Sequence, residues 1–231
     1  MIVAMDSKTV VISVGGSLIV PDVIDTNFLT SLKTFVLSHV EKGASFIIIA
    51  GGGKTARRYQ DAANTVTPLT PEDLDWLGIH ATRLNAHLLR SVFFEHAHPI
   101  IITDPTEPVP TTHKIVIAAG WKPGWSTDYD AVLLAKQVGA KKVINLSNID
   151  YAYTADPKKD PSATPIEKIS WAEFRKLLPE KWDPGLSSPF DPIAAKEAET
   201  LGLEVAIING SKLEEVTNYL EGKSFVGTKI G

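Results

Sequence analysis

One stretch of the chain, residues 46–58, constrains the fold more than any other. Its sequence is Phe-Ile-Ile-Ile-Ala-Gly-Gly-Gly-Lys-Thr-Ala-Arg-Arg. The apolar run 46–49 is rich in β-branched residues, which is typical of a strand covered on both faces. The glycines at 51–53 can turn sharply and expose bare backbone N–H groups, and the following helix directs its positive end at the same point, with Arg57 one turn further on. The stretch therefore predicts an anion site, most suitably for phosphate.

Two other interpretations of this glycine turn have to be weighed. Gly53, Lys54 and Thr55 match the end of the phosphate-binding P-loop, G-x-x-x-x-G-K-[ST], but the opening glycine of that motif falls on Ile48. The P-loop interpretation therefore fails. A glycine turn can also serve only to pack a helix against a strand, and the stretch by itself leaves that alternative open.

Composition excludes several classes of protein. The 231 residues carry 23 Lys and Arg against 27 Asp and Glu, a net charge of -4, which argues against broad nucleic-acid binding. The chain has no cysteine, so disulfides and thiolate metal sites are excluded. Residues 1–8 lack a signal-peptide layout, and no run approaches the roughly 20 apolar residues that span a bilayer. We expect a soluble cytoplasmic protein with no membrane partner.

Strands alternate with helices along the chain, and this order predicts the fold class. Thr26 or Asn27 is expected to cap one helix, and Thr70 followed by Pro71 begins a longer one. Parallel strands need crossover connections, so we expect an α/β fold with a mainly parallel sheet and helices on both faces. No clear linker divides the chain, although a soft boundary lies near Leu146. The expected strands are 10–14, 46–49, 99–102, 114–118, 142–146, 204–208 and an edge strand within 224–230.

Three of the expected strand ends carry glycine clusters, at 15–16, 51–53 and 120–124. In open α/β sheets, ligands sit beyond the carboxyl ends of the strands. Three glycine turns that converge on one edge are much stronger evidence than any one of them. The pattern predicts a site for a phosphate chain, or for two phosphate-bearing molecules.

The chain also carries a series of motifs in a fixed order. They are Gly15-Gly16-Ser17; Gly51-Gly52-Gly53 with Arg57; Asp75-Trp-Leu-Gly-Ile79 followed by Thr82-Arg-Leu-Asn-Ala86; Pro123-Gly-Trp-Ser-Thr-Asp128; Asn148-Ile-Asp-Tyr-Ala-Tyr-Thr-Ala-Asp-Pro157; and Phe190-Asp-Pro-Ile-Ala-Ala-Lys196. In this order and spacing they resemble the amino-acid kinase superfamily and, within it, the archaeal-type uridylate (UMP) kinases. The resemblance covers nearly the whole chain, and the Asp-Pro and Thr-Arg-Leu-Asn-Ala motifs are its most specific parts.

The resemblance implies a three-layer α/β/α sandwich around a mainly parallel sheet. It implies a single amino-acid kinase domain over 1–231, with the acceptor nucleotide in 1–146 and ATP in 147–231. The implied reaction is phosphoryl transfer from ATP to UMP, which gives UDP and ADP. The implied partners are small-molecule nucleotides and further copies of the chain, usually in a hexamer.

The resemblance also assigns roles to individual residues. Gly51, Gly52, Gly53 and Arg57 would hold the UMP phosphate, Asp75 would bond the ribose hydroxyls, and Thr127 would lie near the acceptor nucleotide. Gly15, Gly16 and Ser17 would cradle the transferring phosphoryl group, and Asp128 would order the catalytic groups or Mg²⁺, directly or through water. Lys54 or Lys196 could supply a cation that faces phosphate. Asn148, Tyr153, Asp156 and Asp191 are the expected contacts of ATP.

These residue types suit phosphoryl transfer. Two phosphate-rich substrates repel each other, so a site must supply positive charge and fixed N–H dipoles where charge spreads in the transition state. In-line positioning is the main remaining task. Mg²⁺ bridges ATP phosphates and prefers oxygen ligands and water, so one carboxylate can suffice.

Several alternatives stay open from the sequence. Asp75 can be a solvated helix carboxylate, Arg83 an ion-pair partner or a ligand, and Asp128 and Asp191 helix caps. Ser13 stands where many members of the family carry lysine, and Tyr151 stands where they carry glycine. These two departures support a second hypothesis, a non-catalytic nucleotide- or oxyanion-binding storage-type protein on the same fold.

Overall fold

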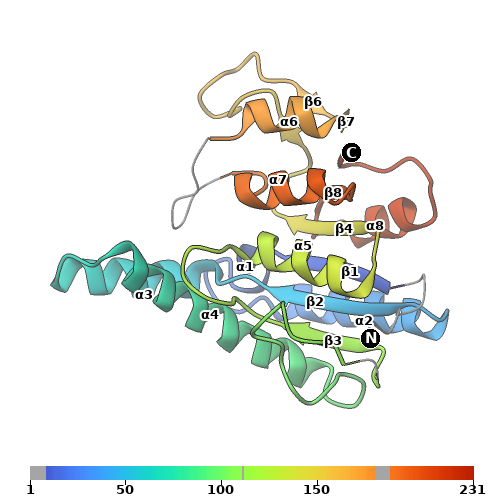
Figure 1. The fold of residues 1–231 in the computed structure, drawn as a ribbon, viewed down its shortest axis with the longest axis horizontal. Helices are drawn as coiled ribbons and strands as arrows, with labels where there is room; N and C mark the ends of the chain where they lie inside the picture. The colour runs from blue at the N-terminus through green and yellow to red at the C-terminus, as the bar shows by residue number, and fades with distance from the viewer. Residues whose placement is uncertain (1–8, 111, 180–187) are drawn as a thin grey trace.

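The computed structural model describes residues 9–110, 112–179 and 188–231. Its centre is a seven-stranded sheet in the order β3-β2-β1-β4-β8-β9-β7 (Figure 1). The bounds are Thr9–Val14 (β1), Ser45–Ala50 (β2), Ile115–Ala118 (β3), Lys142–Ser147 (β4), Lys168–Ile169 (β7), Glu204–Asn209 (β8) and Thr228–Ile230 (β9). The first five strands in this order run parallel, whereas β9 pairs antiparallel with β8, and β7 runs parallel to β9. The predicted mainly parallel sheet is confirmed.

Eight helices connect the strands of the described chain. Their bounds are Gly16–Ile19 (α1), Thr26–Glu41 (α2), Gly53–Val66 (α3), Pro71–Val92 (α4), Thr127–Val138 (α5), Trp171–Leu177 (α6), Pro192–Thr200 (α7) and Leu213–Leu220 (α8). A small antiparallel hairpin, β5 (Ala152–Tyr153) and β6 (Pro165–Ile166), lies outside the main sheet, where a protruding hairpin is expected from the polar, turn-rich sequence.

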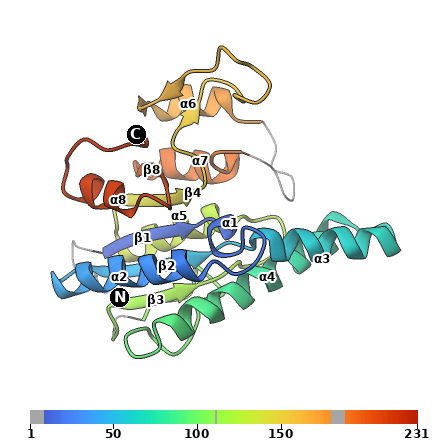
Figure 2. The same ribbon diagram turned by 180° about the vertical axis from the view of Figure 1, so that it is seen from behind.

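Two apolar cores cover the two faces of the sheet, so the three-layer prediction is confirmed. Strand β2 shows why the sequence folds this way: Phe46 and Ile48 join the core under α1, α2, α4 and α8, whereas Ile47 and Ile49 join the core under α5, α6 and α7. The helices of the second set lie in front of the sheet in Figure 1, and α2 and α8 face the viewer in Figure 2. Each fully buried isoleucine contributes about 1.5–3 kcal/mol, so a charged residue in this strand would disrupt the core on the face to which its side chain points.

Helix starts follow local capping chemistry. Thr70 and Asp73 form a reciprocal capping box at the start of α4, with Pro71 in the first turn, as predicted. The predicted cap of α2 is wrong: the side chain of Asp25, rather than Thr26 or Asn27, accepts the backbone N–H of Phe28 at 2.9 Å. A carboxylate one residue earlier satisfies the same free N–H groups.

Two of the strand predictions need correction. Residues 99–102 form no strand; only isolated bridges join Ala97 to Ile115 and Ile102 to Ala118, because Pro99 lacks an N–H and cannot continue a ladder. The tail does supply a strand, β9, but this strand is not at the edge of the sheet. It lies between β8 and β7, and the two-residue strand β7 forms the edge.

Candidate active site

The turns after β1 and β2 pack backbone against backbone. A Cβ atom added to Gly16 would lie 2.0 Å from the nitrogen of Gly53, and one added to Gly53 would lie 2.1 Å from the carbonyl oxygen of Gly16. Gly53 also has a φ of +61°, in the left-handed region that favours glycine. No side chain fits between these two turns. The predicted convergence of the glycine clusters is therefore confirmed for the first two of them.

A cavity of about 330 Å³ opens where these turns meet the segment after β3. Gly120 and residues 125–128 complete its wall, and Arg57 from α3 and Asp75 from α4 line it as well. The cavity lies beyond the carboxyl ends of β1, β2, β3 and β4, which is the position expected for a ligand in a parallel sheet. Segments of the chain more than 100 residues apart thus form one site.

Asp128 lies at the floor of the cavity and is tied to three neighbours. Its Oδ1 accepts the hydroxyl of Ser13 at 3.0 Å and the side-chain amide of Asn145 at 2.9 Å, and its Oδ2 accepts the backbone N–H of Asp191 at 3.3 Å. Burial, followed by the nearby charge of Asp191, raises the pKa of Asp128 to about 7. Ser126 caps α5 through the N–H of Tyr129, so the capping alternative for Asp128 is wrong and its carboxylate is available to the cavity.

Asp130 is a second buried carboxylate, two residues further along α5. It is 1% exposed, and its Oδ2 accepts the backbone N–H of Trp121 at 3.1 Å. Its Oδ1 has no hydrogen-bond partner among the described residues. Burial raises the pKa of Asp130 to about 8. Asp130 therefore anchors the start of the loop that follows β3, although burial makes its ionised form unfavourable.

Asp75 reaches across the mouth of the cavity to the same loop. Its Oδ2 accepts the backbone N–H of Gly124 at 2.8 Å. Burial raises its pKa above the usual value, and the Gly124 N–H lowers it again in part. Asp75 is thus not a freely solvated helix carboxylate, which was the alternative to a ligand role.

Aromatic rings form a stack on this loop. The ring centroids of Trp125 and Tyr129 lie 4.3 Å apart, and those of Trp121 and Trp125 lie 6.2 Å apart, in stacked orientations. The ammonium group of Lys122 lies 3.7 Å from the centroid of the Trp121 ring. Trp125 is the member of the stack that lines the cavity, and sequence analysis assigned it no role.

The structure brings most of the predicted acceptor and transfer residues together. The predicted residues that line the cavity are Gly15, Gly16, Ser17, Gly51, Gly52, Gly53, Arg57, Asp75, Thr127 and Asp128. Lys54 is not among the lining residues; its backbone N–H donates to the carbonyl of Val20, and its side chain plays no part in the wall. Ser13 does line the cavity, and its hydroxyl donates to Asp128.

The predicted ATP contacts lie outside this cavity. Asp191 caps α7 through the N–H of Ala194 at 2.7 Å, which confirms the capping alternative. Asp156 is exposed and accepts the backbone N–H of Lys158 at 3.0 Å. Asn148 and Tyr153 lie on the loop and hairpin after β4.

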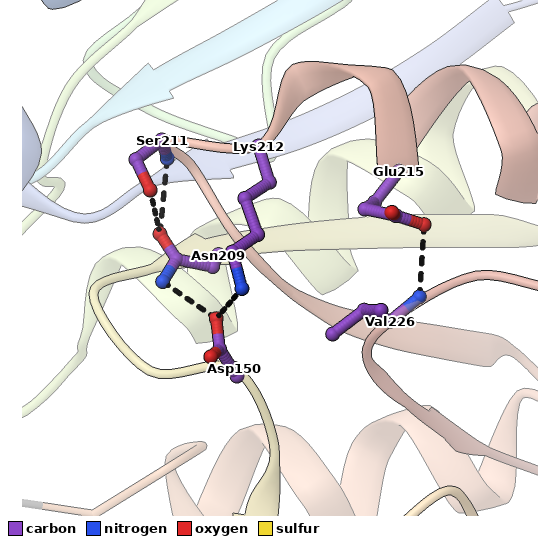
Figure 3. Close-up of polar contacts among 6 residues, drawn as sticks. All are labelled: Asp150, Asn209, Ser211, Lys212, Glu215 and Val226. Atoms are coloured by element: carbon purple, nitrogen blue, oxygen red, sulfur yellow. Dashed lines mark hydrogen bonds and ion pairs between the residues drawn. The ribbon is translucent and has the colours of Figure 1, made fainter.

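The loops after β4 and β8 are joined by a polar cluster that sequence analysis missed. Asp150 Oδ1 accepts the side-chain amide of Asn209 at 2.8 Å and pairs with Lys212 Nζ at 2.8 Å (Figure 3). Lys212 and Asn209 lower the pKa of Asp150. In the same view, Glu215 accepts the backbone N–H of Val226 and fixes the chain that leads to β9. The sequence places Asp150 and Lys212 in the loops after two strands. Their pairing could not be predicted from this, because it depends on β4 and β8 being neighbours in the sheet.

The described residues offer neither a clustered metal site nor a membrane-spanning helix. No group of three or more His, Cys, Asp or Glu side chains is arranged to hold a metal ion in the described chain. None of the described helices combines the length and apolar character needed to cross a membrane.

Comparison with known proteins places these features in context. A model of the amino acid kinase family matches residues 8–209. A uridylate kinase of Methanospirillum hungatei is 34% identical over 225 residues, which cover 96% of this chain and 94% of the relative. The crystal structure of a uridylate kinase from Archaeoglobus fulgidus matches with a TM-score of 0.81 and 30% identity, over 97% of this chain and 100% of the other. A UMP kinase structure from Bacillus anthracis, with a TM-score of 0.80, 21% identity and coverage of 97% and 96%, shares the fold.

Proposed function

This chain belongs to the amino acid kinase family, and from this premise we propose that it transfers the γ-phosphoryl group of ATP to UMP. The products are UDP and ADP, and the enzyme is a phosphotransferase with a phosphate group as acceptor. The observation that carries the proposal is the single cavity at which the glycine turns 15–17 and 51–53 meet. The choice of UMP as the substrate follows from the uridylate kinases of M. hungatei and A. fulgidus, which match this chain nearly end to end.

The acceptor phosphate is proposed to bind at the turn after β2. Gly52 and Gly53 present backbone N–H groups there, at the positive end of the 14-residue helix α3. Arg57 lines the same cavity and supplies a full positive charge. Asp75 and Thr127 line the part of the cavity next to the loop after β3, where the nucleoside of UMP would lie.

The transferring phosphoryl group is proposed to pass over residues 15–17. This turn packs against the acceptor turn without an intervening side chain, so two phosphates held by the two turns lie end to end. Fixed N–H dipoles in that position stabilise charge that develops on the transferring group without reorganisation. Positioning of the two substrates supplies much of the remaining barrier reduction.

The residues at Asp128 fit a magnesium ion. Mg²⁺ takes oxygen ligands and keeps several waters, so it needs few protein groups. Asp128 accepts three hydrogen bonds, and an ionised carboxylate offers about four acceptor positions, so one position remains for the metal or a metal-bound water. A bound Mg²⁺ would neutralise phosphate charge, and its positive charge would also lower the pKa of Asp128, which burial raises. Ser13 and Asn145 hold the carboxylate in place.

The ATP nucleoside is proposed to bind in the second half of the chain, residues 147–231, with residues 1–146 forming the acceptor half. Asn148, Tyr153 and Asp156 remain the candidate contacts of ATP, and Asp191 acts through α7 and Asp128. The Asp150–Lys212 pair joins the two loops that would flank the nucleotide. We also propose a cytoplasmic location.

The proposed enzyme is a homo-oligomer, in line with the hexamer that the family resemblance implies. Large apolar side chains are exposed on α3 and α4, among them Val66 at 86% and Leu84 at 62%. Exposed apolar groups of this size on two helices that pack together suit a subunit interface. Light scattering is expected to give about six times the 25.0 kDa chain mass; a monomeric mass would refute the assembly but not the activity.

The decisive experiment measures ADP release from Mg-ATP with UMP, CMP, AMP, GMP and acetylglutamate as acceptors. UMP is expected to give the highest kcat/KM. The named relatives are kinases, which supports turnover over the non-catalytic storage-type alternative that Ser13 and Tyr151 raised. ATP binding without turnover of any acceptor would nevertheless refute the proposed reaction.

A further inference from the structure

Asn85 of α4 is a buried polar residue to which the reaction above assigns no role. Its side chain is 3% exposed. Its Nδ2 donates to the carbonyl of Gly51 at 2.8 Å and to the carbonyl of Gly52 at 3.2 Å. Both carbonyls belong to the turn proposed to hold the acceptor phosphate. One amide group therefore fixes two successive peptide units of that turn.

The direction of these carbonyls determines the direction of the neighbouring N–H groups. No described peptide bond is cis, and in a trans peptide the C=O and N–H bonds point to opposite sides. Because the Gly51 and Gly52 carbonyls point toward Asn85, the N–H groups of Gly52 and Gly53 point the other way. Both glycines line the cavity. Neither N–H has a hydrogen-bond acceptor among the residues that the structure describes.

The same helix face also holds the loop after β3. Thr82, one turn before Asn85 on α4, accepts the N–H of Gly120 at 2.8 Å and donates to the carbonyl of Ile79 at 2.7 Å. Arg83 donates to the carbonyls of Gly120, at 3.4 Å, and Trp121, at 3.0 Å. Arg83 thus binds backbone carbonyls, and both walls of the acceptor site are fixed by side chains of one helix.

We propose that Asn85 is a positioning residue for the acceptor phosphate. It acts by turning the Gly52 and Gly53 N–H groups into the cavity, without touching the substrate itself. This inference rests on the proposed function, since it assumes that the turn receives the phosphate of a nucleoside monophosphate. In a purely structural role, Asn85 would only supply the donor that the two buried carbonyls need. A positioning role predicts that loss of Asn85 weakens a ligand with a phosphate group more than the same ligand without it, whereas a purely structural role predicts no such difference.

The test compares UMP with uridine, which lacks the phosphate, in calorimetric titrations of the wild type and Asn85→Ala. Loss of the positioning amide is expected to weaken UMP about tenfold, while uridine affinity changes less than twofold. The KM for UMP should rise by a similar factor, and the KM for ATP should stay within twofold. If Asn85→Ala does not fold, Asn85→Leu fills the space of the amide and still lacks the donor.

Trp171→Phe provides the matched control. It removes another buried side-chain hydrogen bond to a carbonyl, from Trp171 Nε1 to Leu203 at 2.8 Å, in a helix that does not line the cavity. It is expected to lower the unfolding temperature without changing the ratio of UMP to uridine affinity. An unchanged ratio in the Asn85 variants would overturn the proposal.

Failure of the proposed function would be seen separately, in the wild type. If the wild type phosphorylates another nucleoside monophosphate instead of UMP, the substrate is refuted. The role of Asn85 is then decided by the ratio of the affinity for that nucleotide to the affinity for its nucleoside: an unchanged ratio in the Asn85 variants would overturn the proposal.

Discussion

The two halves of the molecule join their loops in opposite ways. In the proposed acceptor half, residues 1–146, the turns after β1 and β2 meet backbone to backbone, and a Cβ at Gly16 would lie 2.0 Å from the nitrogen of Gly53. In the second half, the loops after β4 and β8 meet through the side chains of Asp150 and Lys212, which are 40% and 39% exposed. The first junction leaves no room for a side chain at Gly16 or Gly53, whereas the side chains of the second are partly exposed to solvent and can change their positions. If the two substrates bind as proposed, the acceptor phosphate meets a rigid surface and the ATP nucleoside meets a more adaptable one.

The strongest test of this comparison is Gly16→Ala. The added methyl group would clash with backbone atoms that cannot move away, so the two turns must separate. Misplacement by about 1 Å can cost about a hundredfold in rate, and we expect kcat/KM to fall at least that much. Gly139→Ala is the control, because Gly139 has a positive φ of +71° but open space around it; it should cost about 1–2 kcal/mol of stability and leave the rate intact. Equal rates for the two variants would contradict a rigid junction.

Arg57→Ala is the next largest expected effect. A hydrogen bond to a charged group contributes about 1.5–3 kcal/mol, so the KM for UMP should rise about 10- to 100-fold while the KM for ATP changes little. The neighbouring variant Arg58→Ala is the matched control, since Arg58 pairs with the exposed Asp22 and does not line the cavity. If UMP and ATP were weakened equally, the division of the site between the two halves would be wrong.

Asp130 predicts a pH dependence of stability that arises in the acceptor half. Its ordinary pKa is 3.8 and its pKa in the folded chain is raised to about 8, with burial as the main cause. The unfolded chain therefore loses this proton near pH 4 while the folded chain keeps it, so the contribution of Asp130 to stability is fully present below pH 4 and is lost as the pH rises to about 8. We expect the unfolding temperature of the wild type to be lower at pH 8 than at pH 5. Asp130→Asn should reduce this difference by about 1–3 kcal/mol, or about 2–12 °C; an identical difference in both proteins would refute the assignment.

The smallest effect is expected from Lys212→Met. Exposed ion pairs contribute about 0–1 kcal/mol, so the unfolding temperature should hardly change. Because Lys212 helps to set the spacing of the two loops, the KM for ATP should rise a few-fold while the KM for UMP stays constant. Lys223→Met, which breaks a pair with Glu221 in the same half, should change neither. If Lys212→Met raised the KM for UMP more than the KM for ATP, the assignment of the second half to ATP would be wrong.

The rigid half was also the more predictable one. Glycine at 15–16 and 51–53 after apolar runs indicates strand ends whatever the tertiary structure, and a parallel sheet brings such ends together. The polar partners were not predictable in this way. Asn85 lies in a motif that was recognised, but its two carbonyl acceptors become visible only when α4 packs along the turn. Asp150 and Lys212 are 62 residues apart and meet because β4 and β8 are adjacent in the sheet.

Strand β9 has a consequence for how the protein is made. It is the last of the seven strands to emerge from the ribosome, yet it lies between β8 and β7. Strand β7 cannot dock on the sheet until residues 228–230 have been synthesised, since its pairing in the main sheet is with β9. The region before residue 147 contains β1, β2 and β3 as adjacent strands and can assemble while translation continues. The nascent chain is therefore expected to bring together the turns proposed to bind phosphate first, and to complete the opposite edge of the sheet only after β9 has been made.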